Sequence, residues 1–594
     1  MAEKLTNEQQ AAVDSRERSL LVSAAAGSGK TKVLVERLFS YVEREGANLD
    51  DFLIITYTRA AASELRGKIA KALTERMERD PGNYHLRQQM LRVYRADIKT
   101  VDAFCTALLR ENCHLLGEDA RGHVLRPDFR VLDENEAQVL RERVLARTLD
   151  DFYDCLTPGG TLLADTLGAG RDDSALEDLV LELHAKLQAQ PYEDKWLEAQ
   201  RAFWRAVPDK IENTPYGKIL LNEVRRKARH CKNLLQRAAQ EMCANDALNQ
   251  KYAPAFLDAS YQLEALEGKT AEGWDAARGV TIAFPRLAAV KDSDGGEMKA
   301  RMKSLWDNCK ETVKGFAEIF SASSDEAVED LRTMASAMLA LIDLTADFSR
   351  RYNEEKRRRN SADFSDQEHE AIRLLIGEDG APTELARIVS ARYREIMVDE
   401  YQDTNEVQNR IFDAISCKGE NLFTVGDVKQ SIYRFRLADP RIFLQHYNTW
   451  PPLEDAEEHD SAKLLLSRNF RSRKEVLDAT NFIFCNILSE EMGELDYGAD
   501  EMLRLGANYV ESSACGAEFH LLDLPTQTGE QRVRASEAEA AFVADYISDM
   551  LTSEFPIQDD KTKELRPVRE EDIVILMRSP STRLLDYRRA LEAR

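Results

Sequence analysis

Near the N-terminus, an apolar stretch runs directly into a glycine-containing loop and then into a helical pattern. The stretch is LLVSA at Leu20 to Ala24, the loop lies within AAAGSGKT at 24–31, and a helix is expected from Lys30. Backbone N–H groups of such a loop and the N-terminus of the next helix can surround a phosphate, while Lys30 reaches terminal phosphates and Thr31 offers a hydroxyl to magnesium. Ala24 replaces the usual first glycine, but the strand-loop-helix context favours a phosphate loop over an ordinary turn.

The first hundred residues alternate short apolar runs with helical patterns, which is typical of a parallel β-sheet. A second apolar run, FLIIT, occupies Phe52 to Thr56. Strand patterns then disappear and return at Glu395 to Val398 (EIMV) and at 421–425 (NLFTV). The sequence therefore predicts an α/β fold whose sheet is interrupted near residue 110 and resumes later.

Long amphipathic patterns fill the interruption, from about 111 to 350. One helical face carries Leu140, Val144, Leu149, Phe152 and Leu156. The apolar spacing from Val328 to Tyr352 predicts a helix longer than about thirty residues. After the sheet resumes, a further alternation begins near Leu464, with strand candidates at 518–524 and 572–577.

The segment IMVDEYQDTNEVQ places Asp399 and Glu400 directly after a buried strand. Nucleotide hydrolysis requires acidic groups that hold a metal and orient water. We therefore expect Asp399 to bind magnesium and Glu400 to act as the base. Taken alone, Asp-Glu after an apolar strand is often only a polar strand end, but its occurrence together with Lys30 favours a nucleotide site.

Composition limits the classes of partner. The formal net charge is -24, so any affinity for nucleic-acid phosphates must come from a local cluster of Lys and Arg. The nine cysteines are scattered singly, a pattern expected of reduced thiols. Neither a secretory signal nor an apolar run long enough to span a bilayer is present, so we expect a cytoplasmic protein with no membrane association.

Five further stretches follow a recognisable order. They are LTNEQQAAV at 5–13, TYTRAAASELRGKI at 56–69, TVDAFC at 100–105, VGDVKQSIYRFR at 425–436 and SRNFRS at 467–472. Together with the phosphate loop and the acidic segment, they resemble the motifs of superfamily 1 DNA helicases of the UvrD/RecB type. Seven matches in order are far more specific than any one of them.

The resemblance implies that the chain uses ATP and Mg²⁺. Gln9 would read the adenine, Gln430 would contact the region of the γ-phosphate, and Arg471 would stabilise charge that develops during phosphoryl transfer. The expected catalytic residues are Lys30, Asp399, Glu400, Gln430 and Arg471. The nucleotide itself would be held by Gln9, Ala25, Ala26, Gly27, Ser28, Gly29, Lys30, Thr31 and Arg471, with Thr31 and Asp399 binding the metal.

The resemblance also implies contacts with single-stranded and double-stranded DNA. Bases would stack on Tyr57, Tyr433 and Phe435, a contact that every base allows. The remaining candidates are Arg59, Arg66, Thr100, Arg434 and Arg436, with the basic run at 356–359 as a weaker one. Asp102 stands where the family often has histidine, and its carboxylate would repel a phosphate, so no DNA contact is expected there.

The implied domains follow the pattern of the family. A RecA-like P-loop domain, 1A, would form in two halves, 1–110 and 351–460, separated by an all-α insertion, domain 1B, at 111–350. A partial second RecA-like domain, 2A, would occupy 461–594. Later helicase motifs and a nuclease-like acidic cluster are absent from the sequence. We therefore expect a fragment of a longer protein, which would bind nucleotide but hydrolyse it poorly.

Two stretches point to one branch of the family. RPDFRVLDENEAQVL at 126–140 and NSADFSDQEHEAI at 360–372 resemble AddA, the helicase-nuclease protein that partners AddB in double-strand break repair. This resemblance implies 3'-to-5' movement on single-stranded DNA, an AddB-like nuclease partner and action at the nucleoid. The alternatives are a stand-alone UvrD-like repair helicase and a non-catalytic DNA-binding fragment. A small-molecule P-loop enzyme is disfavoured because it leaves Tyr57, Tyr433 and Arg436 unexplained.

Overall fold

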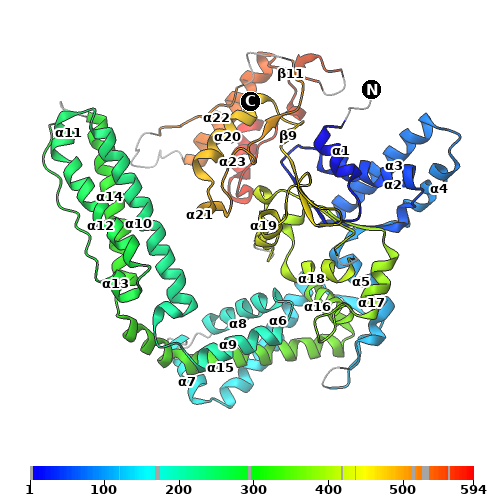
Figure 1. The fold of residues 1–594 in the computed structure, drawn as a ribbon, viewed down its shortest axis with the longest axis horizontal. Helices are drawn as coiled ribbons and strands as arrows, with labels where there is room; N and C mark the ends of the chain where they lie inside the picture. Colours follow the sequence, from blue (N-terminus) through cyan, green and yellow to red (C-terminus); the bar gives the residue numbers. More distant parts are fainter. Residues whose placement is uncertain are drawn as a thin grey trace. The chain divides into compact units, whose positions relative to one another are not determined.

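The computed structural model describes residues 5–118, 121–167, 174–291, 296–416, 419–434, 437–510, 516–524, 534–559 and 562–594. The chain forms two compact units (Figure 1). The first comprises Met1–Gly117, Leu125–Phe129 and Phe364–Arg594, and the second comprises Glu118–Val124 and Arg130–Asp363. Within the described ranges, no helix combines the length and the apolar character needed to cross a bilayer.

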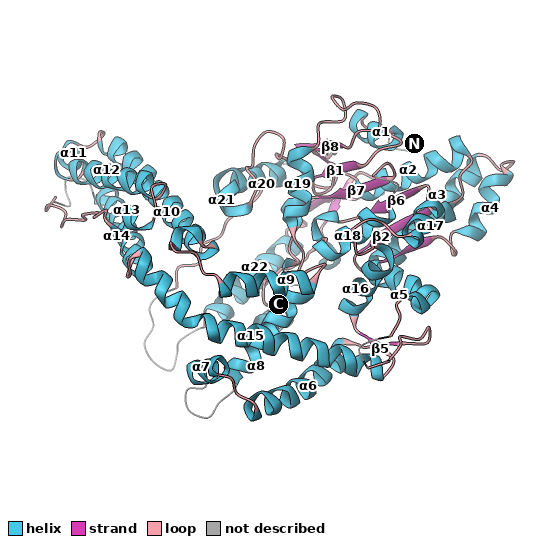
Figure 2. Cartoon of the chain, turned by 60° about the horizontal axis from the view of Figure 1, so that its bottom comes forward, coloured by secondary structure: helices cyan, strands magenta, loops and turns pink. Residues whose placement is uncertain are grey.

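The first unit contains a six-stranded sheet in which every pairing is parallel. Its strands, in spatial order, are β3 (Asp97–Thr100), β2 (Phe52–Thr56), β6 (Glu395–Val398), β7 (Leu422–Gly426), β1 (Leu20–Ala24) and β8 (Ala462–Leu466) (Figure 2). β1, β2, β6 and β7 are buried throughout, which explains their continuous apolar sequences. The predicted parallel α/β fold, with these four strands, is confirmed.

Helices cover both faces of the sheet because the strand order reverses. The chain steps one way from β1 to β2 to β3 and the other way from β6 to β7, and right-handed crossovers then place the connecting helices on opposite faces. One face packs against α1 (Asn7–Asp14), α2 (Lys30–Glu45), α3 (Arg59–Arg79) and α4 (Tyr84–Arg92). The other layer contains α5 (Val101–Asn112), α16 (Phe364–Leu375), α17 (Glu384–Arg392), α18 (Glu406–Ile415) and α19 (Pro440–Thr449).

The end of the first unit contains short strands and helices of different lengths. They are β9 (Arg468–Asn469), α20 (Lys474–Ile487), α21 (Glu490–Gly493), β10 (Arg504–Leu505), α22 (Ala535–Thr552), β11 (Pro556–Gln558), β12 (Leu565–Pro567) and α23 (Pro580–Glu592). β9 pairs with β10 in parallel, and β11 pairs with β12 antiparallel.

Two strand predictions for this end of the chain need correction. The further alternation expected to begin near Leu464 starts with β8, which pairs with β1 at the edge of the main sheet. The strands expected at 518–524 and 572–577 do not form among the described residues, where Phe519 and Leu576 are each 90% exposed. Alternating apolar residues predict a half-buried strand, but a strand also needs a hydrogen-bonded neighbour, which no described segment provides there.

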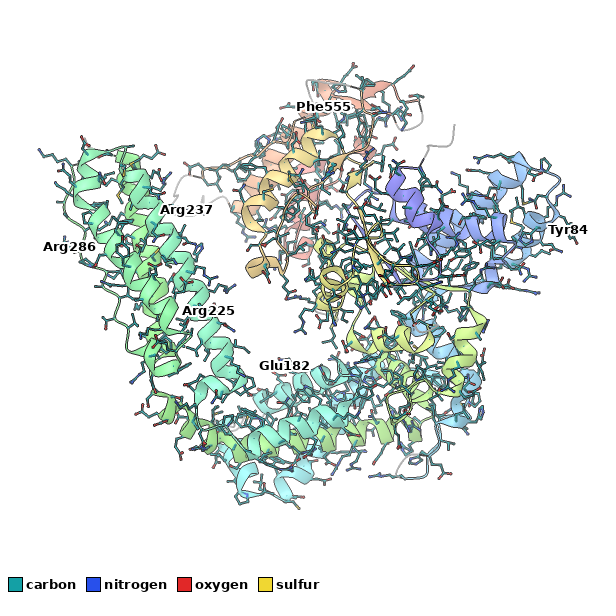
Figure 3. All side chains as sticks on the ribbon, viewed as in Figure 1. Tyr84, Glu182, Arg225, Arg237, Arg286 and Phe555 are labelled. Atoms are coloured by element: carbon teal, nitrogen blue, oxygen red, sulfur yellow. The ribbon has the colours of Figure 1, made fainter. Side chains whose placement is uncertain are left out.

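The second unit is helical apart from β4 (Arg130–Val131) and β5 (Ser361–Ala362). Its helices are α6 (Glu134–Asp154), α7 (Pro158–Leu167), α8 (Ser174–Gln188), α9 (Glu193–Arg205), α10 (Pro215–Met242), α11 (Asp246–Lys251), α12 (Ala253–Lys269), α13 (Trp274–Arg278), α14 (Gly296–Ile319) and α15 (Ser324–Arg358). The predicted long helix is α15, with 35 residues, and it packs against α6, α7, α8 and α9. α10, α12 and α14 form a separate bundle, from which Arg225 and Arg237 project into solvent (Figure 3).

Candidate active site

The glycine-containing loop between β1 and α2 adopts a conformation that only glycine adopts readily at two positions. Gly27 has φ +69° and Gly29 has φ +86°, both in the left-handed region. The turn at Gly29 starts α2 at Lys30, so the positive end of the helix dipole lies at the loop. The hydroxyl of Ser28 is buried and has no hydrogen-bond partner in the described part of the chain. A helix N-terminus beside an unsatisfied buried hydroxyl fits a phosphate group.

The acidic segment lies against this loop. Lys30 Nζ is 2.7 Å from Glu400 Oε2, although 370 positions separate the two residues. β6 lies two strands from β1 in the same sheet, and the backbone N–H of Asp399 donates to the carbonyl of Ile55 at 3.0 Å. The spatial condition for a nucleotide site, a phosphate loop facing carboxylates across one sheet edge, is therefore met.

Glu400 adopts a left-handed conformation, with φ +53°. Non-glycine residues rarely adopt this conformation, and strain of this kind concentrates at functional sites. This conformation occurs just after the end of β6 and directs Glu400 towards Lys30. The Glu400 N–H donates to Asp399 Oδ1 at 3.0 Å. Sequence reasoning could not foresee the strain, because Asp-Glu at a strand end does not require it.

Two carboxyl groups of the acidic segment, those of Asp399 and Asp403, are buried and lie near the charge of Glu400. Burial and the neighbouring charge of Glu400 raise the pKa of Asp399 to about 6, opposed by Lys30. The same two causes raise the pKa of Asp403 to about 6, and Asp403 Oδ1 is buried with no partner among the described residues. Added positive charge would therefore be stabilised here.

A divalent cation with oxygen ligands fits this electrostatic environment. Among the described residues, no group of three or more His, Cys, Asp or Glu side chains is arranged to hold a metal by itself. Mg²⁺ does not need such a group, because it keeps several waters and binds through one or two carboxylates together with phosphates. Thr31, in the first turn of α2, and Asp399 are the residues that would hold it.

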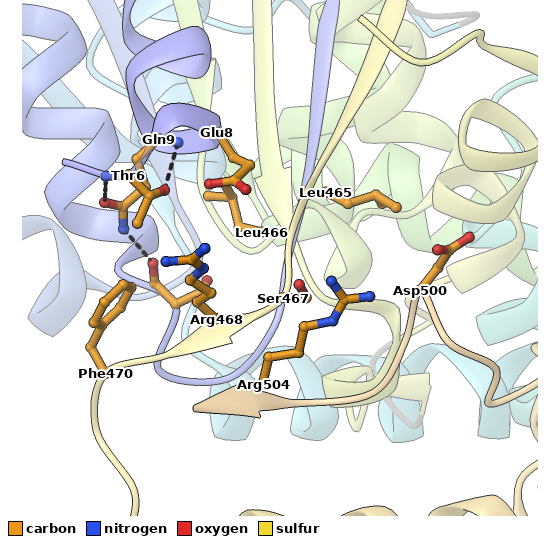
Figure 4. A pocket seen from close by; sticks show the side chains of 11 residues that line it. Thr6, Glu8, Gln9, Leu465, Leu466, Ser467, Arg468, Phe470, Asp500 and Arg504 are labelled. Atoms are coloured by element: carbon orange, nitrogen blue, oxygen red, sulfur yellow. Dashed lines mark hydrogen bonds between the residues drawn. The ribbon is translucent and has the colours of Figure 1, made fainter. Parts of the chain in front are cut away.

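Gln9 connects α1 to the phosphate loop. Its Nε2 donates to the carbonyl of Ser28 at 2.9 Å, and its Oε1 accepts from the Thr6 N–H at 3.0 Å. Beside it lies a cavity of about 170 Å³ (Figure 4). The cavity lining includes Gln9, Ser28, Leu466, Arg468, Phe470 and Arg504. A planar ring could enter this space next to the loop, with Phe470 as an aromatic wall.

The segment that follows β8 closes over the loop from the other side. Asn469 Nδ2 donates to the carbonyl of Ala26 at 2.6 Å, and the Phe470 N–H donates to the carbonyl of Gly27 at 2.8 Å. Asn469 Oδ1 accepts from the backbone N–H of Arg471 at 2.8 Å, and the side chain of Arg471 is exposed. Sequence reasoning selected Arg471 but missed Asn469 and Phe470, which stand beside it in SRNFRS.

Gln430 follows β7 and is connected to Glu400 through Asp427 and Gln402. Its Nε2 donates to Asp427 Oδ2 at 2.7 Å, and the Asp427 N–H donates to Gln402 Oε1 at 2.9 Å. Gln402 Nε2 in turn donates to Glu400 Oε2 at 3.0 Å. Asp427 and Gln402 were both missed, because a polar residue after a buried strand gives no sign of its partner.

Comparison with known proteins decides the family. The profile of the UvrD/REP helicase N-terminal domain matches residues 5–451, three quarters of the chain. The chain belongs to the UvrD/REP helicase family. The family uses ATP, so the loop, the acidic segment and the cavity beside Gln9 are the candidate nucleotide site of this chain.

Individual relatives are similar over almost the whole chain. It is 33% identical to the A subunit of the ATP-dependent helicase/nuclease of Ruminiclostridium cellulolyticum and 34% identical to that of Acetivibrio thermocellus, in each case over 97% of this chain and 49% of the relative. The protein of the same name from Alkaliphilus oremlandii is 35% identical over 97% of this chain and 47% of its own length. The chain thus spans about half the length of these relatives.

The residues predicted to contact DNA in this member of the UvrD/REP helicase family fall into two groups. Arg59 is exposed in the first turn of α3, and the ring of Tyr57 is half-buried just before it. Arg66 and Thr100 already have partners within the unit: Arg66 Nη2 donates to the carbonyl of Ile98 at 2.9 Å, and Thr100 Oγ1 caps α5. Their DNA contacts stay predictions.

The rest of the predicted DNA contacts lie after β7. Tyr433 is half-buried, and Arg434 is ion-paired with Glu494. Phe435 and Arg436 lie outside the described residues. In the second unit, the weaker candidate at 356–359 is unsuited to DNA at its first position, because Lys356 is 1% exposed and pairs with Asp363 at 2.8 Å.

Proposed function

We propose that this chain is the nucleotide-hydrolysing and single-strand-tracking part of an ATP-driven DNA helicase. The observation that supports it most is the Lys30–Glu400 contact of 2.7 Å, which joins the first residue of the helix after the phosphate loop to the acidic segment of a distant strand. A lysine in contact with this carboxylate fits a site whose charges rearrange when ATP binds.

The roles follow from the chemistry of each side chain. ATP would enter as substrate, with its adenine beside Gln9 and Phe470 and its phosphates at the phosphate loop and the N-terminus of α2. Lys30 would exchange Glu400 for phosphate oxygens, and the released Glu400 would orient and deprotonate water. Mg²⁺, when bound, neutralises phosphate charge. Arg471 is placed beside the loop by Asn469 and would stabilise charge that develops on the transferred phosphoryl group.

The wider biological role rests on the relatives. Each is named as the A subunit of an ATP-dependent helicase/nuclease, which favours the motor of an AddAB-like enzyme over a stand-alone repair helicase. We propose 3'-to-5' movement on single-stranded DNA, an AddB-like nuclease partner and a role in double-strand break repair in the cytoplasm. The DNA contacts at Tyr57, Arg59, Tyr433 and Arg436 belong to this proposal.

Two substitutions test the nucleotide site. Lys30→Ala should weaken binding of a fluorescent ATP analogue by about 10-fold or more, because a charge-assisted contact is lost. Glu400→Gln should bind nucleotide but hydrolyse ATP about 100-fold or more slowly, as expected for a general base. Lys71→Ala, an exposed lysine on α3, is the matched control and should change neither quantity.

The DNA part of the proposal needs a separate measurement. Single-stranded oligonucleotide should raise the ATPase rate of the chain. Nucleotide should in turn change the affinity for the oligonucleotide, because linkage is reciprocal. If the oligonucleotide affinity depended on salt but did not change with nucleotide, the proposed motor function would be wrong and a DNA-binding module would be favoured.

A further inference from the structure

The stretch at 360–372 has no role in the nucleotide site described above, yet most of it is built into the first unit. It enters α16, which packs against α5 on one side and α18 on the other. Glu368 is 8% exposed in this helix. Its Oε1 accepts from Gln408 Nε2 at 2.7 Å, and its Oε2 accepts from Asn405 Nδ2 at 3.4 Å. A buried carboxylate with two amide donors must influence how those amides are oriented.

Gln408 also contacts Tyr57, so the orientation of its amide affects the Tyr57 hydroxyl. Its Oε1 accepts from the Tyr57 hydroxyl at 3.3 Å, and that hydroxyl lies 2.5 Å from Thr404 Oγ1. An amide has one donor end and one acceptor end, so a carboxylate that holds Nε2 leaves Oε1 facing the tyrosine. Without the carboxylate, the amide could reverse, and the Tyr57 hydroxyl would lose an acceptor.

Thr404 connects Tyr57 to the nucleotide side. It follows Asp403 in the acidic segment, and Gln402 Nε2 in this segment donates to Glu400 Oε2 at 3.0 Å and to Asp403 Oδ2 at 3.3 Å. The same Glu400 oxygen pairs with Lys30. The segment from Glu400 to Thr404 is therefore bonded at one end to Lys30 of the phosphate loop. At its other end it is bonded to Tyr57, which is predicted to contact DNA.

We propose that Glu368 is a positioning residue that, through Gln408, holds the Tyr57 hydroxyl on Thr404 and so couples oligonucleotide binding at Tyr57 to nucleotide binding at Lys30 and Glu400. The proposal rests on the proposed function, because it takes Tyr57 as the DNA contact. It adds a residue that touches neither ligand.

The charge of Glu368 determines the strength of this link. Burial and the charge of Asp102 raise its pKa to about 7, while its hydrogen bonds from Gln408 and Asn405 lower it. The titratable groups near it are Asp102 and Cys105 on α5, His369 on α16 and Tyr57 before α3, whereas α18 presents neutral amides. An ionised carboxylate accepts a stronger hydrogen bond than a protonated one. The coupling should therefore strengthen as pH rises through the Glu368 pKa.

The coupling is measured as a ratio of two dissociation constants. The Kd of a fluorescent oligo-dT for the whole chain is determined with and without a non-hydrolysable ATP analogue, at about pH 6 and about pH 8, on either side of the Glu368 pKa. For the wild type, the ratio at the higher pH should be about 5-fold or more, within the usual range of allosteric coupling, and should fall towards 1 at the lower pH. Glu368→Gln should give one small ratio at both pH values. Asp399 and Asp403 titrate in both proteins, so the difference isolates Glu368.

Two further variants complete the test. Glu384→Gln, on the exposed end of α17, makes the same chemical change and should behave as the wild type. Tyr57→Phe breaks the link at its other end, so it should also remove the pH dependence, and adding Glu368→Gln to it should reduce the ratio no further. This variant also serves if Glu368→Gln fails to fold.

The outcomes separate the two proposals. A wild-type ratio of 1 at both pH values would overturn the proposed motor and this inference with it. A wild type that is coupled, beside a folded Glu368→Gln or Tyr57→Phe variant that keeps the full pH-dependent ratio, would overturn only the role of Glu368.

Discussion

At the scale of single residues, Gly27 shows how closely the phosphate loop and the segment after β8 fit together. A Cβ atom at Gly27 would lie 2.7 Å from Asn469 Nδ2 and 2.9 Å from Arg471 Cβ, in a backbone conformation with φ +69°. Gly27→Ala should therefore displace Asn469 from the loop and weaken binding of a fluorescent ATP analogue by about 10-fold, because strain and collision together cost roughly 1–2 kcal/mol.

The chain provides a matched control for this prediction. Gly46, at the end of α2, has the same φ of +69°, and a Cβ there would meet nothing within 4 Å. Gly46→Ala should thus lower the free energy of unfolding by about 1 kcal/mol through strain alone and leave nucleotide affinity unchanged. Equal affinity losses in both variants would show that the contact with Asn469 is unimportant.

The raised pKa of Glu368 also predicts how the stability of the protein changes with pH. Its pKa is raised from 4.5 to about 7, so the folded protein binds more protons than the unfolded chain between these pH values. Stability must then fall as pH rises through this window, by roughly 3 kcal/mol at most from this group. Urea unfolding at about pH 5 and about pH 8 should show Glu368→Gln gaining on the wild type at the higher pH. A stability difference that does not change with pH would contradict the raised pKa.

At the scale of secondary-structure elements, one buried ion pair joins α2 to β6. Arg37 is fully buried and donates to Glu395 through Nε at 2.8 Å and Nη2 at 2.5 Å, and Tyr41 donates to the same carboxylate at 3.0 Å. Both elements lead directly into the nucleotide site. Arg37→Ala should cost about 3–5 kcal/mol of unfolding free energy, since it leaves a buried carboxylate without its positively charged partner.

Another arginine of α2 distinguishes this effect from a general loss of charge. Arg44 pairs with Asp14 at 2.6 Å, but their side chains are 61% and 44% exposed. Arg44→Ala should change stability by less than about 1 kcal/mol in the same urea titration, because exposed pairs contribute little. A loss of similar size in both variants would refute the special role of burial.

The elements that could be predicted from the sequence are those specified by local patterns. β1, β2, β6 and β7 are continuous apolar runs because both faces of the sheet are covered, and α15 repeats its apolar spacing over its whole length. Strand pairing is not local. β8 therefore joined a sheet that its own sequence does not indicate, and 518–524 formed no strand although its residues alternate.

Prediction of the candidate nucleotide site was likewise limited to what local sequence patterns specify. The loop residues and the Asp399–Glu400 pair stand in recognisable sequences, and Lys30 and Glu400 do meet. Gln402, Asp427 and Asn469 stand inside the quoted motifs, but each acts through a partner on another segment, so the sequence alone does not distinguish them from their neighbours. The catalytic and DNA-binding roles of the selected residues stay predictions, as does the assignment of 461–594 to a second RecA-like domain.

At the scale of the whole molecule, the two units have separate apolar cores. One core lies between the main sheet and α1 to α4, while others lie within the helices of the second unit. All the residues of the proposed nucleotide site belong to the first unit. A ligand stabilises only the unit that binds it, by about 2.7 kcal/mol at a concentration 100-fold above its Kd. We therefore expect two thermal transitions, of which nucleotide raises only one.

Tryptophan fluorescence can tell the transitions apart, because Trp196, Trp204, Trp274 and Trp306 lie in the second unit and only Trp450 lies in the first. Mg²⁺ and an ATP analogue should raise the Tm seen by calorimetry for the first unit and leave the main fluorescence transition in place.

Phe256→Ala removes a ring stacked 4.8 Å from Trp306, so it should lower the fluorescence transition through a cavity cost of about 3–5 kcal/mol without changing nucleotide affinity. Lys30→Ala should do the reverse, abolishing the nucleotide-induced shift and sparing the fluorescence transition. If nucleotide raised both transitions together, the units would have to unfold as one.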